Sequence, residues 1–204
     1  MDLARPRTSQ WDSAMRNFPL TLLVASLIAL LTVPRARAAD FTPEPGFTLI
    51  FNGKNLDGWQ TAKTATPEPL QGKTEAFGGR FKVVEGTLVY DPAVKGNLYV
   101  ETVKEFSKDV HIKLDFNAGA KCNNDFFLRG TKFDVVPGMK ETKNVKEGEW
   151  TTLEIIVQGD KVEHKVGGES VRTSKASAAS SRFMLRAEFG AIQIRNIRVK
   201  EVVQ

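Results

Sequence analysis

The feature that most constrains this chain is the alternation of apolar and polar side chains over short segments. Residues 110–116 (VHIKLDF) alternate strictly, and Trp150–Gln158 places Leu153, Ile155 and Val157 on one side. Because successive side chains of a β-strand point to opposite faces, both segments are predicted to be strands with one buried face. Turn signals recur about every ten residues between such segments, which is typical of an all-β sandwich. We therefore expect one all-β domain made of two sheets, with little helix.

Two local patterns refine this prediction. Gly159-Asp160 separates Trp150–Gln158 from Lys161–Val166, which predicts a β-hairpin. Within the second strand, His164 shares a face with two valines, so we expect it to be packed inside rather than to be a ligand. Residues 61–79 contain two prolines and three glycines with little periodicity and are predicted to form a long loop.

The first 38 residues have the pattern of an export signal rather than of a folded element. Three arginines precede an uncharged apolar run of sixteen residues, Phe18–Val33, and Ala36-Arg37-Ala38 supplies a cleavage site after Ala38. The alternative is a retained membrane anchor, but the run is short for a span of about 20 residues. We expect residues 39–46 to be a Pro-rich lead-in, residues 47–203 to be the domain, and the protein to be exported to the periplasm or beyond the cell, without membrane contact after cleavage.

Charge and cysteine content exclude some classes of function. The chain carries 29 basic and 24 acidic residues, but residues 39–204 carry 24 and 22, so much of the positive charge belongs to the predicted signal. No basic stripe with interleaved aromatic residues is present, and nucleic acid is not an expected partner. Cys122 is the only cysteine, so no intrachain disulfide can form. The oligomeric state is left open.

Several segments together resemble one known family. Residues 47–59 (FTLIFNGKNLDGW) and 192–202 (IQIRNIRVKEV) are similar to the opening and closing signatures of the 3-keto-disaccharide hydrolase domain family. Between them, in the order of the family, stand residues 81–88 (FKVVEGTL), 122–129 (CNNDFFLR), 148–150 (GEW) and 185–190 (LRAEFG).

The resemblance implies a fold and an activity. The fold would be a jelly-roll sandwich of the concanavalin A-like lectin/glucanase type, and the protein would be an exported hydrolase acting on 3-keto-disaccharides or related glycosides. Three departures from the family's pattern concern the presumed sugar-facing surface. Asn124-Asp125 stands where the family has Ser-Gly, Arg186 replaces a Gln, and the middle insertion is reduced to about residues 131–148.

Candidate catalytic residues follow from the chemistry that this activity needs. A ketone at C3 acidifies the proton on C2, so cleavage requires a base, an acid for the leaving oxygen and a donor for the developing enolate. Asp115 or Glu188 could be the base or acid, and Arg129 or Arg186 could stabilise the oxyanion. If neighbouring strands keep their apolar sets together, Asp115 and Arg129 are expected on the same face, where they could equally be a structural ion pair.

Candidate substrate-binding residues lie on the same predicted strands or near them: Asn124, Asp125, Phe127, Trp59 and Arg195. Trp59 could stack on a sugar ring or anchor the core. Arg195 and Gln193 are expected to face the same way as Arg186, with a β-bulge at Asn196, where the alternation slips. Asn123, Asn124 and Asp125 could hold Ca²⁺ or simply form a turn. The sequence requires no cofactor, and no motif for another metal is present.

Alternative functions remain open at this point. Hydrolysis by two carboxylates is a second catalytic route, which depends on their separation. A non-catalytic carbohydrate-binding module predicts exposed aromatic residues along a groove, for example Trp59, Phe127 or Phe189. An interaction domain of the cell envelope predicts a flat face with paired charges. The enzyme hypothesis instead predicts carboxyls with shifted pKa values clustered in a concave pocket.

Overall fold

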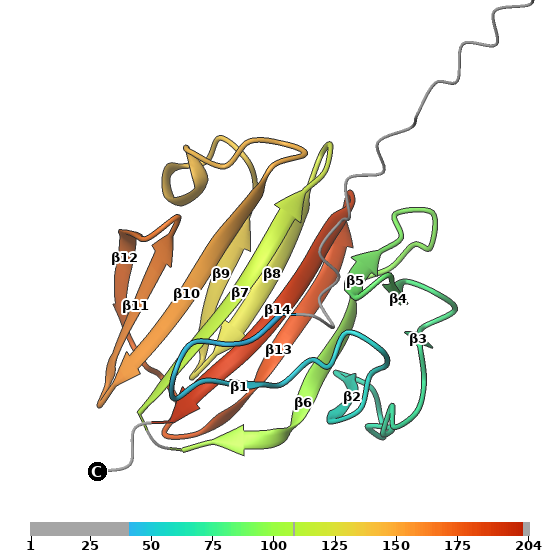
Figure 1. Cartoon of the computed structure of the whole chain (residues 1–204), viewed down its shortest axis with the longest axis horizontal. Helices are drawn as coiled ribbons and strands as arrows, with labels where there is room; N and C mark the ends of the chain where they lie inside the picture. Colours follow the sequence, from blue (N-terminus) through green and yellow to red (C-terminus); the bar gives the residue numbers. More distant parts are fainter. Residues whose placement is uncertain (1–40, 108, 202–204) are drawn as a thin grey trace, which may run out of the picture. The chain divides into compact units, whose positions relative to one another are not determined.

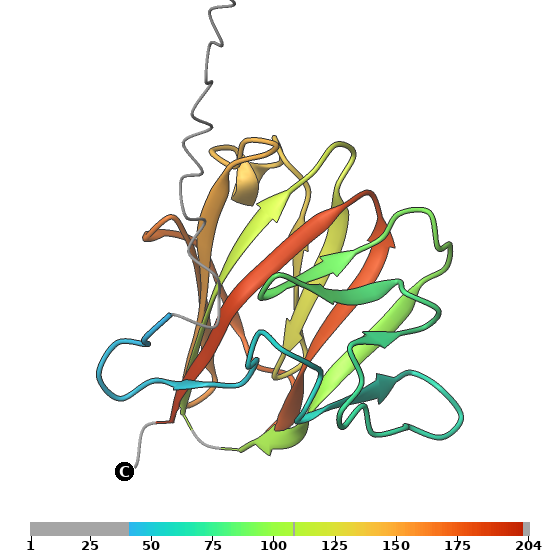
Figure 2. The ribbon, with the colours of Figure 1, turned by 45° about the vertical axis from the view of Figure 1, so that its right-hand side comes forward.

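The computed structural model describes residues 41–107 and 109–201, in two antiparallel sheets that Figures 1 and 2 show as two layers. The predicted export signal lies outside the described residues. The two-sheet all-β sandwich expected from the alternation is confirmed, and within the described residues the only labelled helical segment is a short 3-10 turn, η2 (Lys140–Thr142).

The larger sheet, sheet A, has the strand order β12-β11-β10-β7-β14-β5-β4-β3, and β1 also pairs with β14. Its strands are β1 (Thr48–Leu49), β3 (Glu75–Ala76), β4 (Phe81–Val84), β5 (Thr87–Tyr90), β7 (Val110–Ala118), β10 (Trp150–Gln158), β11 (Lys161–Val166), β12 (Glu169–Lys175) and β14 (Ile192–Glu201).

The smaller sheet, sheet B, has the order β2-β6-β13-β8-β9. Its strands are β2 (Trp59–Ala62), β6 (Leu98–Phe106), β8 (Asn123–Leu128), β9 (Thr131–Val135) and β13 (Ser181–Phe189).

Short turns connect the paired strands of the hairpins, and the turn between β4 and β5 has left-handed backbone conformation. The predicted hairpin of β10 and β11 forms with Gln158 paired to Lys161. Glu85 and Gly86 both have positive φ and join β4 to β5, as two-residue hairpin turns that follow the strand twist require. Residues 61–79, expected as a loop, do include the end of β2 and the two residues of β3.

The core lies between the sheets and is built from the apolar halves of the alternating strands. In β7, all four predicted apolar residues and Ala118 are buried, and in β10 the predicted set is buried as well. Phe126 of β8 contacts Phe116 of β7 across the sandwich and Phe183 of β13 within sheet B, at ring-centroid distances of 6.4 and 6.2 Å. Burial of these rings between the sheets stabilises the domain.

One expectation about strand pairing was wrong. β7 and β8 are consecutive strands, but β7 belongs to sheet A and β8 to sheet B. Since both strands turn their apolar sides toward the same core, their polar sides point away from each other. The expected juxtaposition of Asp115 and Arg129 on one face therefore does not occur.

The segment before β1 packs on the outer face of sheet A. Glu44 accepts two hydrogen bonds from Arg198 of β14, at 2.6 and 2.9 Å, and forms an ion pair with Lys113 of β7 at 3.1 Å. The hydrogen bonds from Arg198 hold the pKa of the Glu44 carboxyl down at about 2. Phe47 packs edge-on against His111. This Pro-rich lead-in is thus tied to the folded unit.

The predicted bulge at Asn196 is confirmed. Asn196 has φ of +54°, and the pairing of β14 with β7 shifts between Arg195 and Arg198. The shift turns Ile197 and Val199 inward, so the second half of β14 also contributes to the core.

Among the described residues, no helix is long and apolar enough to cross a membrane.

His164 is packed inside the sandwich, as its position on β11 predicted. It is 1% exposed, stacks on Phe133 of β9 at 5.1 Å, and neither ring nitrogen has a hydrogen-bond partner. Burial, together with the nearby Arg172 guanidinium, lowers the pKa of His164 to about 3.

A pH-dependent loss of stability follows from His164. In the unfolded chain the imidazole takes up a proton below about pH 6.5, whereas in the folded protein it stays neutral down to about pH 3. Stability should therefore fall as the pH drops through this window, with a slope from this residue approaching ~1.4 kcal/mol per pH unit. Urea unfolding of the His164→Leu variant between pH 4 and 7 should show a shallower slope than the unaltered protein. An unchanged slope in this variant would contradict the assignment.

Candidate functional site

The outer face of sheet B brings charged and aromatic side chains together. Directly paired residues of neighbouring strands point to the same face of a sheet. The strand pairing of sheet B therefore gives two rows of cross-strand partners on this face. The first row is Ala62, Tyr99, Arg186, Asp125 and Asp134, and the second is Gln60, Glu101, Met184, Phe127 and Lys132. We call this surface the site face.

A hollow of about 600 Å³ opens on the site face. Such a volume is in the range of small-molecule sites. Its lining includes two aromatic rings, from Tyr99 and Phe127, whose centroids lie 6.3 Å apart at a tilt of 50°. The charged residues that line it are Lys63, Glu101, Lys132, Arg182 and Arg186.

Arg186 is the centre of the charge cluster at one end of this hollow. Its guanidinium forms ion pairs with Asp125 of β8 and with Glu188 two residues along β13. Burial works against the charged guanidinium, but its contacts with the Tyr99 hydroxyl and with Asp125 raise its pKa above the ordinary value. Arg186 is therefore a permanent cation of the site, and it holds two carboxylates in fixed places.

Asp125 and Asp134 form a pair of carboxyls across β8 and β9. They are direct cross-strand partners, and Asp125 is fully buried. Burial and the nearness of Asp134 raise the pKa of Asp125 to about 6, although Arg186 acts in the opposite direction. The pKa of Asp134 is lowered by Lys132, in spite of partial burial. Asp125 is therefore a carboxyl of the site face with a raised pKa, but it is fully buried and is not part of the lining of the hollow.

Glu101 is the carboxylate that lines the hollow directly. It accepts a hydrogen bond of 2.8 Å from Gln60 and lies 3.9 Å from the Arg182 guanidinium. The side chain of Glu101 is 18% exposed, so it can reach a bound molecule while its orientation is fixed by its neighbours. Glu188, in contrast, lies beside Arg186 and is not part of the lining.

A β-bulge places Glu188. The pairing of β13 with β8 shifts between Arg186 and Phe189, so that Ala187 and Glu188 together face Asn124. The Asn124 amide fills the gap in the ladder: its oxygen accepts from the Glu188 backbone N–H at 2.9 Å, and its nitrogen donates to the Phe189 carbonyl at 2.9 Å. Asn124 is fully buried, so its role in the structure is to hold the bulge.

Asp115 and Arg195 lie on the other side of the molecule, on the outer face of sheet A, so the structure does not bring these two candidate residues together with those of the site face. Asp115 accepts hydrogen bonds from Asn196 and Thr152, at 2.7 and 3.1 Å. Arg195 packs on the ring of Trp150, with 3.9 Å between the guanidinium carbon and the ring centroid. The sheet to which each strand belongs, rather than the alternation, decides their position.

Two further candidate residues, Arg129 and Trp59, make contacts that hold the fold together. Arg129 lies beyond the end of β8, in a turn with Gly130 where both residues have positive φ, and its Nε donates to the Ala178 carbonyl at 2.9 Å. Trp59 is 1% exposed, donates to the Ile50 carbonyl at 2.8 Å and packs edge-on against Phe183. Trp59 is thus a core anchor and offers no face to a ligand.

Of the sequence-predicted site residues, the structure therefore brings together four on the site face, Arg186, Glu188, Asp125 and Phe127, with Asn124 beneath them. Asn124 and Asp125 point to opposite sides of β8, which is a strand here and not a turn, so their oxygens do not converge. Within residues 41–107 and 109–201, no group of three or more His, Cys, Asp or Glu side chains is arranged to hold a metal ion.

Sequence analysis missed four residues of this site: Tyr99, Glu101, Lys132 and Asp134. A usable signal was present in Leu98–Thr102 (LYVET), where Tyr99 and Glu101 alternate with Val100. The signal was insufficient because alternation gives the face of a strand but not its neighbours in the sheet.

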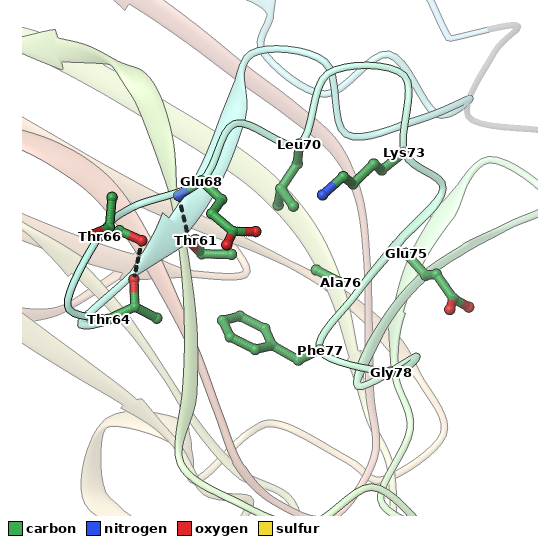
Figure 3. Close-up of a pocket in the computed structure, with 10 residues that line it drawn as sticks. All are labelled: Thr61, Thr64, Thr66, Glu68, Leu70, Lys73, Glu75, Ala76, Phe77 and Gly78. Carbon is green, nitrogen blue, oxygen red and sulfur yellow. Dashed lines mark hydrogen bonds between the residues drawn. The ribbon is translucent and has the colours of Figure 1, made fainter.

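A second hollow, of about 390 Å³, lies between the segment that follows β2 and the segment around β3 (Figure 3). Its lining includes Thr61, Thr64 and Glu68, but the loop itself uses several of these polar groups. Thr61 accepts a hydrogen bond from the Glu68 backbone N–H, and Thr64 donates to the Thr66 carbonyl. Three charged residues, Glu68, Lys73 and Glu75, also line this hollow, which is smaller than the hollow of the site face.

The bulge predicts different roles for two adjacent asparagines. Asn124→Ala removes both partners of the bulge backbone and leaves buried groups unpaired, so the free energy of unfolding should fall by about 3 kcal/mol. Asn123→Ala, at a half-buried position of the same strand, should cost less than about 1 kcal/mol. Chemical denaturation of both variants measures the difference, and equal losses would show that Asn124 has no special role.

Comparison with known proteins identifies the same type of fold as the structure shows, a two-sheet sandwich. The family model for the 3-keto-alpha-glucoside-1,2-lyase-like domain matches residues 46–144. Two candidate glycosyl hydrolases of Parabacteroides distasonis have similar structures. The first has a TM-score of 0.62 and 17% identity, over 78% of this chain and 95% of its own. The second has a TM-score of 0.58 and 14% identity, over 76% and 99%.

No curated protein matched the sequence. At these identities the structural likeness establishes the fold alone, which is a two-sheet jelly roll. The matched residues include Tyr99, Glu101 and Asp125, whereas Arg186 and Glu188 lie beyond them. The resemblance inferred from the sequence is thereby confirmed: residues 46–144 of this chain resemble the 3-keto-disaccharide hydrolase family, also described as 3-keto-alpha-glucoside-1,2-lyase-like.

Proposed function

We propose that the site face binds a glycoside oxidised to a ketone at C3 and cleaves its glycosidic bond. The observation that carries this proposal is the hollow itself, which is lined by Glu101, Arg186 and Lys132 together with the rings of Tyr99 and Phe127. Sugars present apolar ring faces together with many hydroxyls, and this combination of aromatic and charged groups suits both. The family resemblance supports the 3-keto-glycoside as substrate.

The chemistry is an elimination that is followed by hydration. A base removes the proton from C2, and the electron pair moves onto the C3 oxygen as an enolate. The enolate then re-forms the C3 carbonyl and expels the C1 oxygen, which takes a proton as the C1–O bond breaks and a C1=C2 double bond forms. Water then adds its oxygen to C1 and a proton to C2, which completes the hydrolysis.

The residues of the hollow fit these steps. Glu101 is the base we propose, because it is the carboxylate that lines the hollow. Arg186 and Lys132 are the cations for the enolate oxygen, where a fixed positive charge has its largest effect. The Tyr99 hydroxyl, in contact with the Arg186 guanidinium, is the proton donor for the leaving oxygen. Glu188 is the second candidate for the base.

A non-catalytic carbohydrate-binding module is the second candidate function. One observation favours it: the Arg186 guanidinium is already paired with both Asp125 and Glu188, which reduces its capacity to stabilise an enolate. The same hollow would then hold a sugar without reacting with it. For either function, we propose that residues 1–38 direct export and that the protein acts in the periplasm or outside the cell.

Kinetics with isosteric variants test the catalytic proposal. The purified protein is incubated with 3-keto-maltose and with maltose, and released sugar is followed for the unaltered protein and for Glu101→Gln, Glu188→Gln and Asp115→Asn. We expect release from the keto sugar only, and a loss of at least about a hundredfold in kcat for Glu101→Gln. Asp115→Asn, on the other sheet, should retain activity within about twofold.

The outcomes separate the hypotheses. A hundredfold loss in Glu188→Gln, with Glu101→Gln active, would transfer the role of base to Glu188. If no sugar is released but calorimetry detects binding, the catalytic proposal is wrong and the binding module is supported.

A further inference from the structure

The bulge in β13 changes the face on which Phe189 lies. Simple alternation would place Phe189 inside, together with Phe183, Leu185 and Ala187. The register shift instead pairs Phe189 with Asn123, and Asn123 is two residues from Asp125 on β8. Since paired residues point to the same face, Phe189 belongs to the site face, beyond Arg186 and Glu188.

Phe189 is unusually exposed for an aromatic residue. Its exposed fraction is 62%, the highest of any large apolar residue in the described part of the chain. The other large apolar residues that are exposed within residues 41–107 and 109–201 are Val84, Val103 and Met139, none of them aromatic. A phenyl ring in water has a free-energy cost that a covering ligand would relieve.

The backbone that carries this exposed ring is firmly held. Asn124 bonds to the Phe189 carbonyl and to the Glu188 N–H, and the buried Arg80 donates to the Glu188 carbonyl at 3.0 Å. At Gly190, with φ of +68°, a Cβ would lie 2.4 Å from the Lys121 carbonyl oxygen, so the chain turns in close contact with that loop. Bulges that re-aim a side chain are enriched next to active sites.

Spacing along the strand indicates what the ring would contact. Arg186 pairs with Asp125 of β8, and Phe189 pairs with Asn123, two residues away, so the two positions lie roughly 7 Å apart along the strands, which is within the length of a disaccharide. A sugar ring bound in the hollow at Arg186 would therefore leave its second ring near Phe189.

We propose that Phe189 is a stacking platform for the second ring of a two-ring glycoside bound on the site face, and that Asn124 and Arg80 position it by holding the bulge. This inference rests on the proposed function, because it needs a carbohydrate in the hollow. It adds that the site recognises more than the oxidised ring and favours disaccharides over glycosides with a small aglycone.

The test compares a two-ring with a one-ring ligand. The unaltered protein and the variants Phe189→Ala, Phe189→Trp and Met139→Ala are titrated with 3-keto-maltose and with methyl 3-keto-α-glucoside. KM and kcat are measured where there is turnover, and Kd by calorimetry where there is none. We expect Phe189→Ala to raise KM or Kd for the two-ring ligand about tenfold more than for the one-ring ligand. Phe189→Trp, which keeps an aromatic ring, should retain the preference for the two-ring ligand. Met139→Ala, which removes a similarly exposed side chain elsewhere, should retain it as well.

Each outcome decides a different point. If Phe189→Ala affects both ligands equally, or neither, the platform is overturned while the proposed function stands. If the unaltered protein neither binds nor cleaves either ligand, the proposed function fails and the platform with it. Selective loss of two-ring binding without turnover would support the platform on a binding module.

Discussion

The contact of Phe126 with Phe116 and Phe183 is the interaction on which the rest of the structure depends. Phe126 lies on β8 of sheet B, Phe116 on β7 of sheet A, and their rings meet in the core. Once the apolar sides of the two strands face each other, the charged residues of these strands must point outward, in opposite directions. The core therefore decides which charged residues can meet and which cannot.

Two separate charged surfaces result from this arrangement. On sheet A, Asp115, Arg198 and Glu44 are joined to one another and to the segment that precedes β1, so this surface is largely satisfied by the protein itself. On sheet B, Arg186, Asp125 and Glu188 adjoin an open hollow with aromatic rings. The second surface combines charge, a carboxyl with a raised pKa and space for a ligand.

Much of the fold could be predicted from the sequence because strands carry local signals. Alternation identified the buried side of β7, β10 and β11, Gly159-Asp160 identified a hairpin, and the slip at Asn196 identified a bulge. The site could be predicted only in part. Arg186 and Asp125 are cross-strand partners although 61 residues separate them, and no local pattern specifies a pairing at that distance. The short path from β7 to β8 suggested a pairing that the core does not allow.

The central claim is that a sugar binds on the outer face of sheet B and not on that of sheet A. The most direct test is a titration of the ¹⁵N-labelled protein with 3-keto-maltose, followed by backbone amide chemical shifts. The account predicts shifts that concentrate at Tyr99, Phe127 and Arg186 and extend to Phe189, with none at Asp115 or Arg198. Shifts confined to Asp115, Arg195 and their neighbours on β7 and β14 would contradict it.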